Sequence, residues 1–189
     1  MDAYQNGNQQ TNNLVIEKPV HTSMQSSQLM QLFKNELKDI FWAERALTTA
    51  IPKMIENASS LELIVALKSH LEETNEHVGR LLNIFAIVDE KPFAKKCDAM
   101  EDLIEESLEI MEFYEKGSMR DAGIILAAQK VEHYEIATYR SLCQFAQILG
   151  LDKAVPLLAA TLQEEKKADE KLAEVAITAI NVEEFQEII

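Results

Sequence analysis

The sequence predicts an all-α protein, an antiparallel four-helix bundle with a long helical connection between its second and third helices. Glycine and proline are few, five and four among 189 residues, which favours helices over a turn-rich fold. Apolar residues recur at spacings of three and four along four long stretches, the period of one helix face. The length and the 47% of hydrophobic residues are enough for one domain with a sizeable core.

The predicted domain covers residues 26–182. Its four bundle helices are expected at residues 27–57, 60–88, 119–149 and 152–180. An additional helix over about residues 98–116, ended by Gly117, makes the connection between the second and third bundle helices long and helical. Residues 1–25, rich in Gln and Asn, are expected to form a disordered or arm-like tail, and residues 183–189 a short C-terminal tail.

Net charge and cysteine content indicate which binding partners to expect and in which cellular compartment the protein lies. A net charge of −14 repels nucleic acid and anionic membranes, so we expect neither as a partner. Cys97 and Cys143 have no metal-binding spacing and form no disulfide framework. No apolar run approaches the ~18 residues of a membrane helix, and no secretory signal is visible. These features predict a cytoplasmic protein.

Each of the four bundle helices carries acidic residues on the stripe that is otherwise apolar. A carboxylate in a helical core costs several kcal/mol unless something compensates its charge. In an antiparallel bundle the four intrusions converge, and a pair of metal ions is the simplest group that holds them there. Carboxylate oxygens suit iron and manganese and can bridge two ions, so we expect two Fe or Mn ions. The candidate ligands are Glu44, Glu73, His77, Glu132, Glu135, Glu165 and Asp169.

Two positions in this set are ambiguous. On the fourth helix the apolar stripe favours Glu165, whereas a weak internal repeat aligns Glu164 with Glu73 instead. On the second helix, His77 follows Glu73 at Glu-x-x-x-His spacing, so it is either a ligand or a histidine satisfied by protein partners. His70 fits a satisfied histidine better.

His133 is expected to face a neighbouring helix or the subunit surface. It lies about 100° around the helix from Glu132.

Several segments carry a family resemblance. ELKDIFWAERAL, SHLEETNEHVGRL, AAQKVEHYEIATY and TLQEEKKADEKL, within residues 27–182, resemble bacterial stress proteins of the YciE/YciF type in the ferritin-like superfamily. The resemblance implies a ferritin-like four-helix bundle that is usually a homodimer and is linked to stress responses without a settled reaction. Carried over by position, it implies ligands at Glu44, Glu132, Glu135 and Glu165, and His77 stands where related proteins often have Gln.

Three functions remain open at this stage. The first is a di-iron or di-manganese oxidoreductase that reacts with O2 or peroxide. The second is a non-catalytic stress-protection or binding bundle with a degenerate metal site, which the irregular Glu-x-x-x-His spacing favours. The third, an iron-storage cage, has less support because no fifth helix for a cage axis is evident. No catalytic residue can be assigned.

Overall fold

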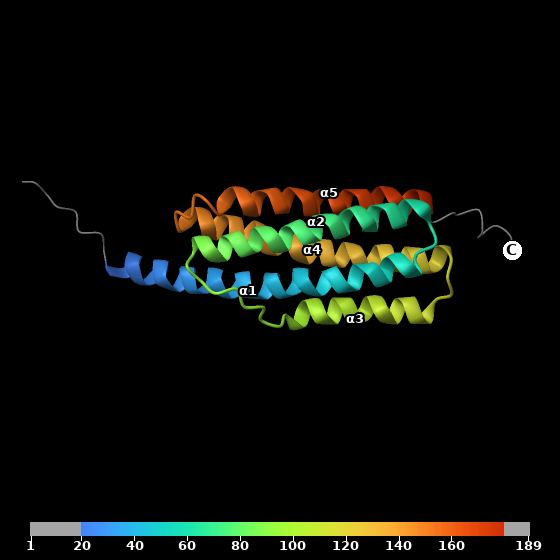
Figure 1. Ribbon diagram of the computed structural model, residues 1–189, viewed down its shortest axis with the longest axis horizontal. Helices are drawn as coiled ribbons and strands as arrows, with labels where there is room; N and C mark the ends of the chain where they lie inside the picture. Colours follow the sequence, from blue (N-terminus) through green and yellow to red (C-terminus); the bar gives the residue numbers. More distant parts are fainter. Residues whose placement is uncertain (1–19, 180–189) are drawn as a thin grey trace, which may run out of the picture.

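The described part of the chain, residues 20–179, folds into five α-helices. The computed structural model describes residues 20–179, and no strand occurs in that part of the chain (Figure 1). The helices are α1 (Val20–Asn57), α2 (Leu61–Ile87), α3 (Asp98–Phe113), α4 (Ser118–Ile148) and α5 (Val155–Ala179).

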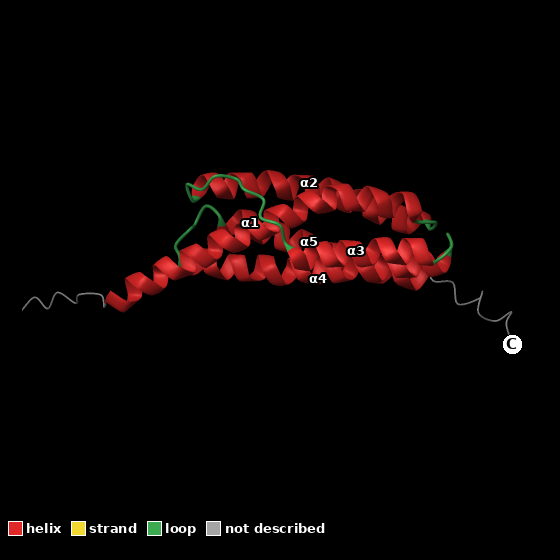
Figure 2. Cartoon of the chain, turned by 90° about the horizontal axis from the view of Figure 1, so that it is seen from below, coloured by secondary structure: helices red, strands yellow, loops and turns green. Residues whose placement is uncertain are grey.

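Four of these helices form the bundle, and the fifth packs on its outside. α1 packs on α2 and α4, and α5 packs on the same two helices, so α1 and α5 are diagonal to each other. α1 and α5 run in one direction and α2 and α4 in the other (Figure 1). α3 lies in the crossover from α2 to α4, along α1 and α4 (Figure 2). Two antiparallel helix pairs joined by one long crossover are the ferritin-like connectivity, so the predicted fold class is confirmed.

The core is the stripe that the three-and-four spacing predicts. On α1 this stripe is buried from Phe33 through Leu37, Ile40 and Leu47 to Ile51, each at most 2% exposed. On α2 the buried residues continue the same spacing but include polar side chains at His70, Thr74 and His77. The helices therefore form because one face of each is apolar, and the polar positions interrupt that face near its middle.

A buried carboxylate joins the start of α2 to α4. Asp121 is 2% exposed, and its two oxygens accept hydrogen bonds from the backbone N–H groups of Ser59 and Ser60, both at 2.7 Å. The first N–H groups at a helix start have no partner within the helix, and a carboxylate there also meets the positive end of the helix dipole. Asp121 is thus a buried acid that is fully explained by protein partners.

The N-terminal boundary of the first helix differs from the expectation. α1 begins at Val20, so residues 20–25, which composition assigns to the tail, belong to a helix. Residues 20–27 contain no Gly or Pro to end a helix, and Ser and Gln are tolerated within one. Residues 1–19 and the predicted C-terminal tail lie outside the described residues. Within residues 20–179, no helix is long and apolar enough to cross a membrane.

Candidate metal centre

Six ionisable side chains from all four bundle helices are buried together in the core. α1 contributes one carboxylate, α2 two histidines, α4 two carboxylates and α5 one carboxylate. All are 8% exposed or less, and they are Glu44, His70, His77, Glu132, Glu135 and Glu165. Charged groups are seldom fully buried unless they are paired or bind a metal, so this concentration calls for a specific partner.

The six residues form two clusters that share one member. Glu44 and His77 meet Glu165 in the first, with one ligand atom from each within 4.8 Å of the others. The second joins His70, Glu132 and Glu135 to the same Glu165 under the same limit. A carboxylate common to two adjacent groups of ligands is the arrangement that bridges two ions.

Most of the polar atoms in these clusters have no hydrogen-bond partner. Glu135 and Glu165 have two such oxygens each, and one atom each is unpartnered on Glu44, Glu132, His70 and His77. An unsatisfied buried polar group costs about 1–3 kcal/mol, so these side chains need a further binding partner. Asp121 needs none, because both of its oxygens already accept hydrogen bonds. Carboxylate oxygens with two imidazole nitrogens suit Fe(II) and Mn(II), and the residues therefore fit a metal pair.

Without metal, two of the carboxyl groups, those of Glu132 and Glu135, hold their protons more strongly than usual. Burial raises the pKa of Glu135 well above its ordinary range, and the charges of Glu165, Glu44 and Glu132 add to the effect. The pKa of Glu132 is raised in the same way, first by burial and then by Glu165. Metal binding would release these protons, because a metal ligand must be deprotonated.

The two histidines respond in opposite ways to the same site. Burial lowers the pKa of His70 to about 4, with a contribution from the charge on His77, so His70 is neutral at pH 7. Burial also opposes a charge on His77, but the carboxylates of Glu165 and Glu44 outweigh it and raise its pKa to about 11. His77 Nδ1 lies 3.0 Å from Glu165 Oε1 and 3.3 Å from Glu44 Oε1. In the metal-free protein, the positive charge of the His77 imidazolium therefore balances part of the negative charge of Glu44 and Glu165.

The outer nitrogen of His77 is held by a separate pair of residues. His77 Nε2 lies 3.0 Å from Glu164 Oε2, and Arg80 donates from both terminal nitrogens to the Glu164 carboxylate. Arg80 Nη1 also donates to Thr161 Oγ1 at 3.2 Å. A carboxylate that accepts from one ring nitrogen leaves the other as the ligand atom and fixes the ring orientation. Glu164 therefore has an outer, supporting position, whereas Glu165 lies inside.

Five of the seven sequence-predicted ligands are brought together, and two are not. Glu44, His77, Glu132, Glu135 and Glu165 lie in the clusters. Glu73 and Asp169 lie outside both.

Glu73 lies beside the clusters and not within them because of its helix register. It is half-buried and lies one residue before the inner position Thr74, and each residue turns the helix by about 100°. Asp169 is likewise at the edge, where Gln129 donates to it at 3.2 Å and His133 Nε2 lies 3.2 Å away. His133 itself is exposed on the surface, as expected.

His70, which the sequence favoured as a satisfied histidine and left out of the candidate ligands, lies in one of the two clusters. It lies 3.2 Å from Glu132 through its Nε2 atom and belongs to the second cluster. The available signal was its position on the strict four-and-three stripe of α2, about two turns before His77. That stripe places both imidazoles on the buried face.

The fold defines the architectural class of the protein, and the comparisons agree with that class. The bundle and its crossover are those of a ferritin-like protein, and the two buried clusters could hold a metal ion. The chain belongs to the DUF892 family, described as a domain of unknown function, whose model matches residues 28–184.

Relatives and solved structures place the chain near one named protein. Protein YciF of Escherichia coli K12 is 43% identical over 162 residues, which are 84% of this chain and 96% of YciF. The crystal structure of YciF, described as an E. coli stress protein, matches with a TM-score of 0.78 and 44% identity over 81% of this chain and 97% of that one. YcfI from Rhodopseudomonas palustris matches with a TM-score of 0.74 and 42% identity, covering 77% and 92%. A Xanthomonas campestris protein, 17% identical with a TM-score of 0.66 over 85% and 99%, shares the fold.

Proposed function

We propose that this protein is a stress-associated ferritin-like protein that binds two iron or manganese ions and reacts with O2 or peroxide. The observation that supports this most is Glu165, which is fully buried, belongs to both clusters and, apart from the ion pair of Oε1 with His77 Nδ1, has no hydrogen-bond partner for its oxygens. The description of YciF as a stress protein supports the physiological part of the proposal.

The residues divide between two metal positions. Glu44 and His77 would hold one ion, His70 and Glu132 the other, and Glu165 would contact both, with Glu135 available beside the second. This ligand set includes His70 and leaves out Glu73 and Asp169. When bound, the metal pair supplies the electrons for reducing O2 or peroxide, which side chains of this kind cannot supply.

The chain's own residues would position the ligands and exclude water. Tyr139 donates to Glu44 Oε1 at 2.5 Å, which orients that carboxylate from the core side. Glu164 and Arg80 hold His77 from the outer side. Complete burial of Glu44, Glu135 and Glu165 keeps bulk water away from the ligands and strengthens their attraction for cations.

An anaerobic titration tests the proposal. Metal-free protein is titrated separately with Fe(II) and Mn(II), and bound metal is measured after equilibrium dialysis; we expect saturation near about two ions per chain. Glu165→Gln should weaken binding at both positions, Glu44→Gln should leave about one ion, and the exposed control Glu170→Gln should bind as the native chain does. Binding of fewer ions by the native chain, or equal binding by Glu165→Gln and the control, would contradict the proposal. Consumption of O2 or peroxide by the loaded protein, absent from Glu165→Gln, then tests the reaction.

A non-catalytic bundle is the second candidate function. It is favoured by contacts that already form without metal: the imidazolium of His77 with Glu44 and Glu165, and the neutral imidazole of His70 with Glu132 at 3.2 Å. In that case an imidazolium replaces the ions, and adding Fe(II) or Mn(II) leaves the thermal midpoint unchanged. A midpoint that rises with metal concentration in the native chain, but not in Glu165→Gln, excludes this candidate.

We also propose a cytoplasmic homodimer. The homodimer is what the family resemblance described above implies, and the cytoplasmic location is what the cysteine content favours. Light scattering measures the mass in solution, and fractionation of cells locates the protein.

A further inference from the structure

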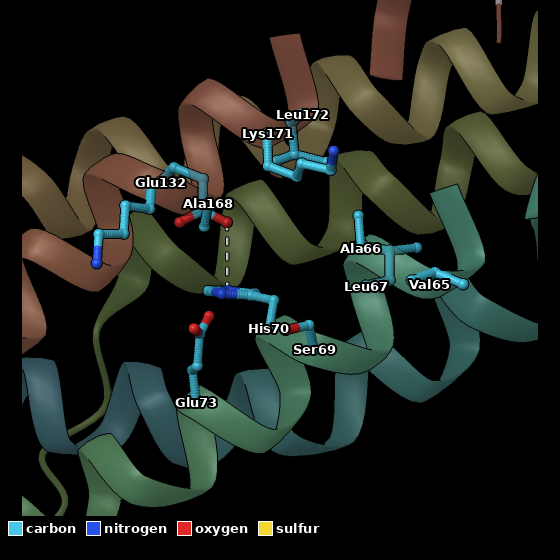
Figure 3. Close-up of a pocket in the computed structure, with 11 residues that line it drawn as sticks. Val65, Ala66, Leu67, Ser69, His70, Glu73, Glu132, Ala168, Lys171 and Leu172 are labelled. Carbon is cyan, nitrogen blue, oxygen red and sulfur yellow. Dashed lines mark ion pairs between the residues drawn. The ribbon is translucent and has the colours of Figure 1, made fainter. Parts of the chain in front are cut away.

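A pocket between α2 and α5 opens beside one half of the candidate metal centre. Its volume is about 330 Å³. Figure 3 shows His70 and Glu132 facing each other in this pocket, and its dashed line joins the two side chains, whose Nε2 and Oε1 atoms are 3.2 Å apart. Both side chains are at least nine-tenths buried, and each has one atom without a hydrogen-bond partner. The pocket therefore connects the surface to a cluster that is not satisfied by protein contacts.

The walls of the pocket are mostly aliphatic. They consist of Val65, Ala66 and Leu67 from α2 and of Ala168 and Leu172 from α5. Val65 is 57% exposed, so the apolar surface reaches solvent. Ala168 lies on the inner stripe of α5, one turn from Leu172, where a larger residue would fill the space. A concave apolar surface with a few polar groups at one end is typical of a small-molecule site.

Two ammonium groups border the same pocket. Lys167 and Lys171 lie one turn apart on α5 and both line it, against one surface carboxylate, Glu73 of α2. Lys171 also forms an ion pair with Glu174 at 3.1 Å. The positive charge of Lys167 favours the ionised form of Glu73 and so acts to lower its pKa. In a chain of net charge −14, two lysines at one opening make that opening less acidic than the surface as a whole. An anionic group is therefore repelled less here than elsewhere on the protein.

We propose that this pocket binds a small amphiphilic acid, an aliphatic chain that ends in a carboxylate. The aliphatic part lies between α2 and α5 against Leu67, Ala168 and Leu172, and the carboxylate faces Lys167 and Lys171. Such a ligand occupies the space next to His70, on one side of the centre only. This inference goes beyond the proposed function, because binding of the acid does not require the metal.

Two probes of equal chain length separate the apolar and the charged contributions. Chelator-treated protein is titrated with octanoate and with octanol by calorimetry and by amide NMR shifts. We expect octanoate to bind saturably, with shifts concentrated at the pocket residues of α2 and α5. Changing both pocket lysines (Lys167→Gln with Lys171→Gln) should weaken octanoate at least about threefold and leave octanol unchanged. The matched control, Lys68→Gln with Lys153→Gln, removes the same charge at exposed positions outside the pocket and should leave both probes unchanged.

Filling the pocket tests its location. Ala168→Trp should abolish binding of both probes, and Ala168→Met, a milder change that keeps the fold, should weaken both. Absence of saturable octanoate binding, or binding that neither change at Ala168 affects, would overturn the proposal. Light scattering distinguishes a second copy of the chain as the occupant: a change of mass on adding octanoate would assign the pocket to a subunit contact and also overturn it. Because the titrations use metal-free protein, failure of metal binding and failure of this inference are separate results.

Discussion

Replacing Glu135 by Gln should stabilise the metal-free protein and destabilise the metal-loaded one. Glu135 is 0% exposed, and neither of its oxygens has a hydrogen-bond partner. An unsatisfied buried group costs about 1–3 kcal/mol, and the Gln amide can donate to neighbouring carboxylates, so we expect a gain of about 2 kcal/mol without metal. For a chain of this size that gain raises the thermal midpoint by roughly 4–8 °C.

The effect should depend on pH in a direction fixed by the pKa of Glu135. Burial, and then neighbouring carboxylates, raise that pKa in the folded state above its unfolded value. A carboxyl of this kind contributes most to stability below its unfolded pKa, and that contribution is lost as the pH rises toward the folded pKa. Gln does not titrate, so the gain from Glu135→Gln should be larger at about pH 8.5 than at about pH 6.

Urea unfolding monitored by circular dichroism measures the change in unfolding free energy caused by Glu135→Gln. The measurement is made at both pH values, once with chelator and once with saturating Mn(II). In metal the sign should reverse, because the variant loses a candidate ligand and with it stabilisation by binding. The control Glu72→Gln, exposed on α2, should change stability by less than about 0.5 kcal/mol in every condition. If Glu135→Gln destabilises the metal-free protein, or gives the same gain at both pH values, the account of the centre as a set of uncompensated carboxylates is refuted.

Three further predictions concern the support of the centre and of the fold. Glu164→Ala removes the group that holds His77 Nε2, and metal affinity should fall about 10–100-fold in competition with a chromophoric chelator; an unchanged affinity would show that the ring needs no outer support. Tyr139→Phe removes the hydrogen bond to Glu44 and should cost about 2 kcal/mol in urea unfolding of the metal-free protein, an effect that a purely packing role of the ring would not give. Asp121→Asn weakens the two hydrogen bonds at the start of α2 and should cost about 1–2 kcal/mol while the metal stoichiometry stays the same; faster amide exchange confined to that helix start is the check, and lost metal binding would contradict the separation of Asp121 from the centre.

The fold was predictable because it follows from periodicity that each segment carries by itself. The apolar stripe of α1 and the stripe of α5 specify which side chains face inward without knowledge of the partner helix. The same stripe argument resolved Glu165 from Glu164, since one residue is about 100° of helix rotation and the structure buries Glu165. The local pattern was therefore more informative than the weak internal repeat.

The site was only partly predictable, because the apolar periodicity of one helix does not determine which residues of another helix it contacts. His70 lies on the inner face of α2, but only the approach of α4 brings Glu132 to 3.2 Å from it. Glu73 is acidic and lies between His70 and His77 in sequence, so it was predicted as a ligand. Its position on the helix instead places it at the opening between α2 and α5. The pocket depends on the spacing between two helices and on small side chains at Ala66 and Ala168, and a single-sequence pattern does not encode that spacing.

The place of Glu165 on α5 has a consequence for how the protein matures in the cell. α5 is the last of the five helices to leave the ribosome, and both halves of the candidate centre need its carboxylate. A nascent chain, or one truncated before α5, can form helical hairpins but cannot offer a complete set of ligands to either ion. A complete set of ligands for either ion would thus exist only after α5 has been made, and loaded protein would report that α5 has docked on the other bundle helices.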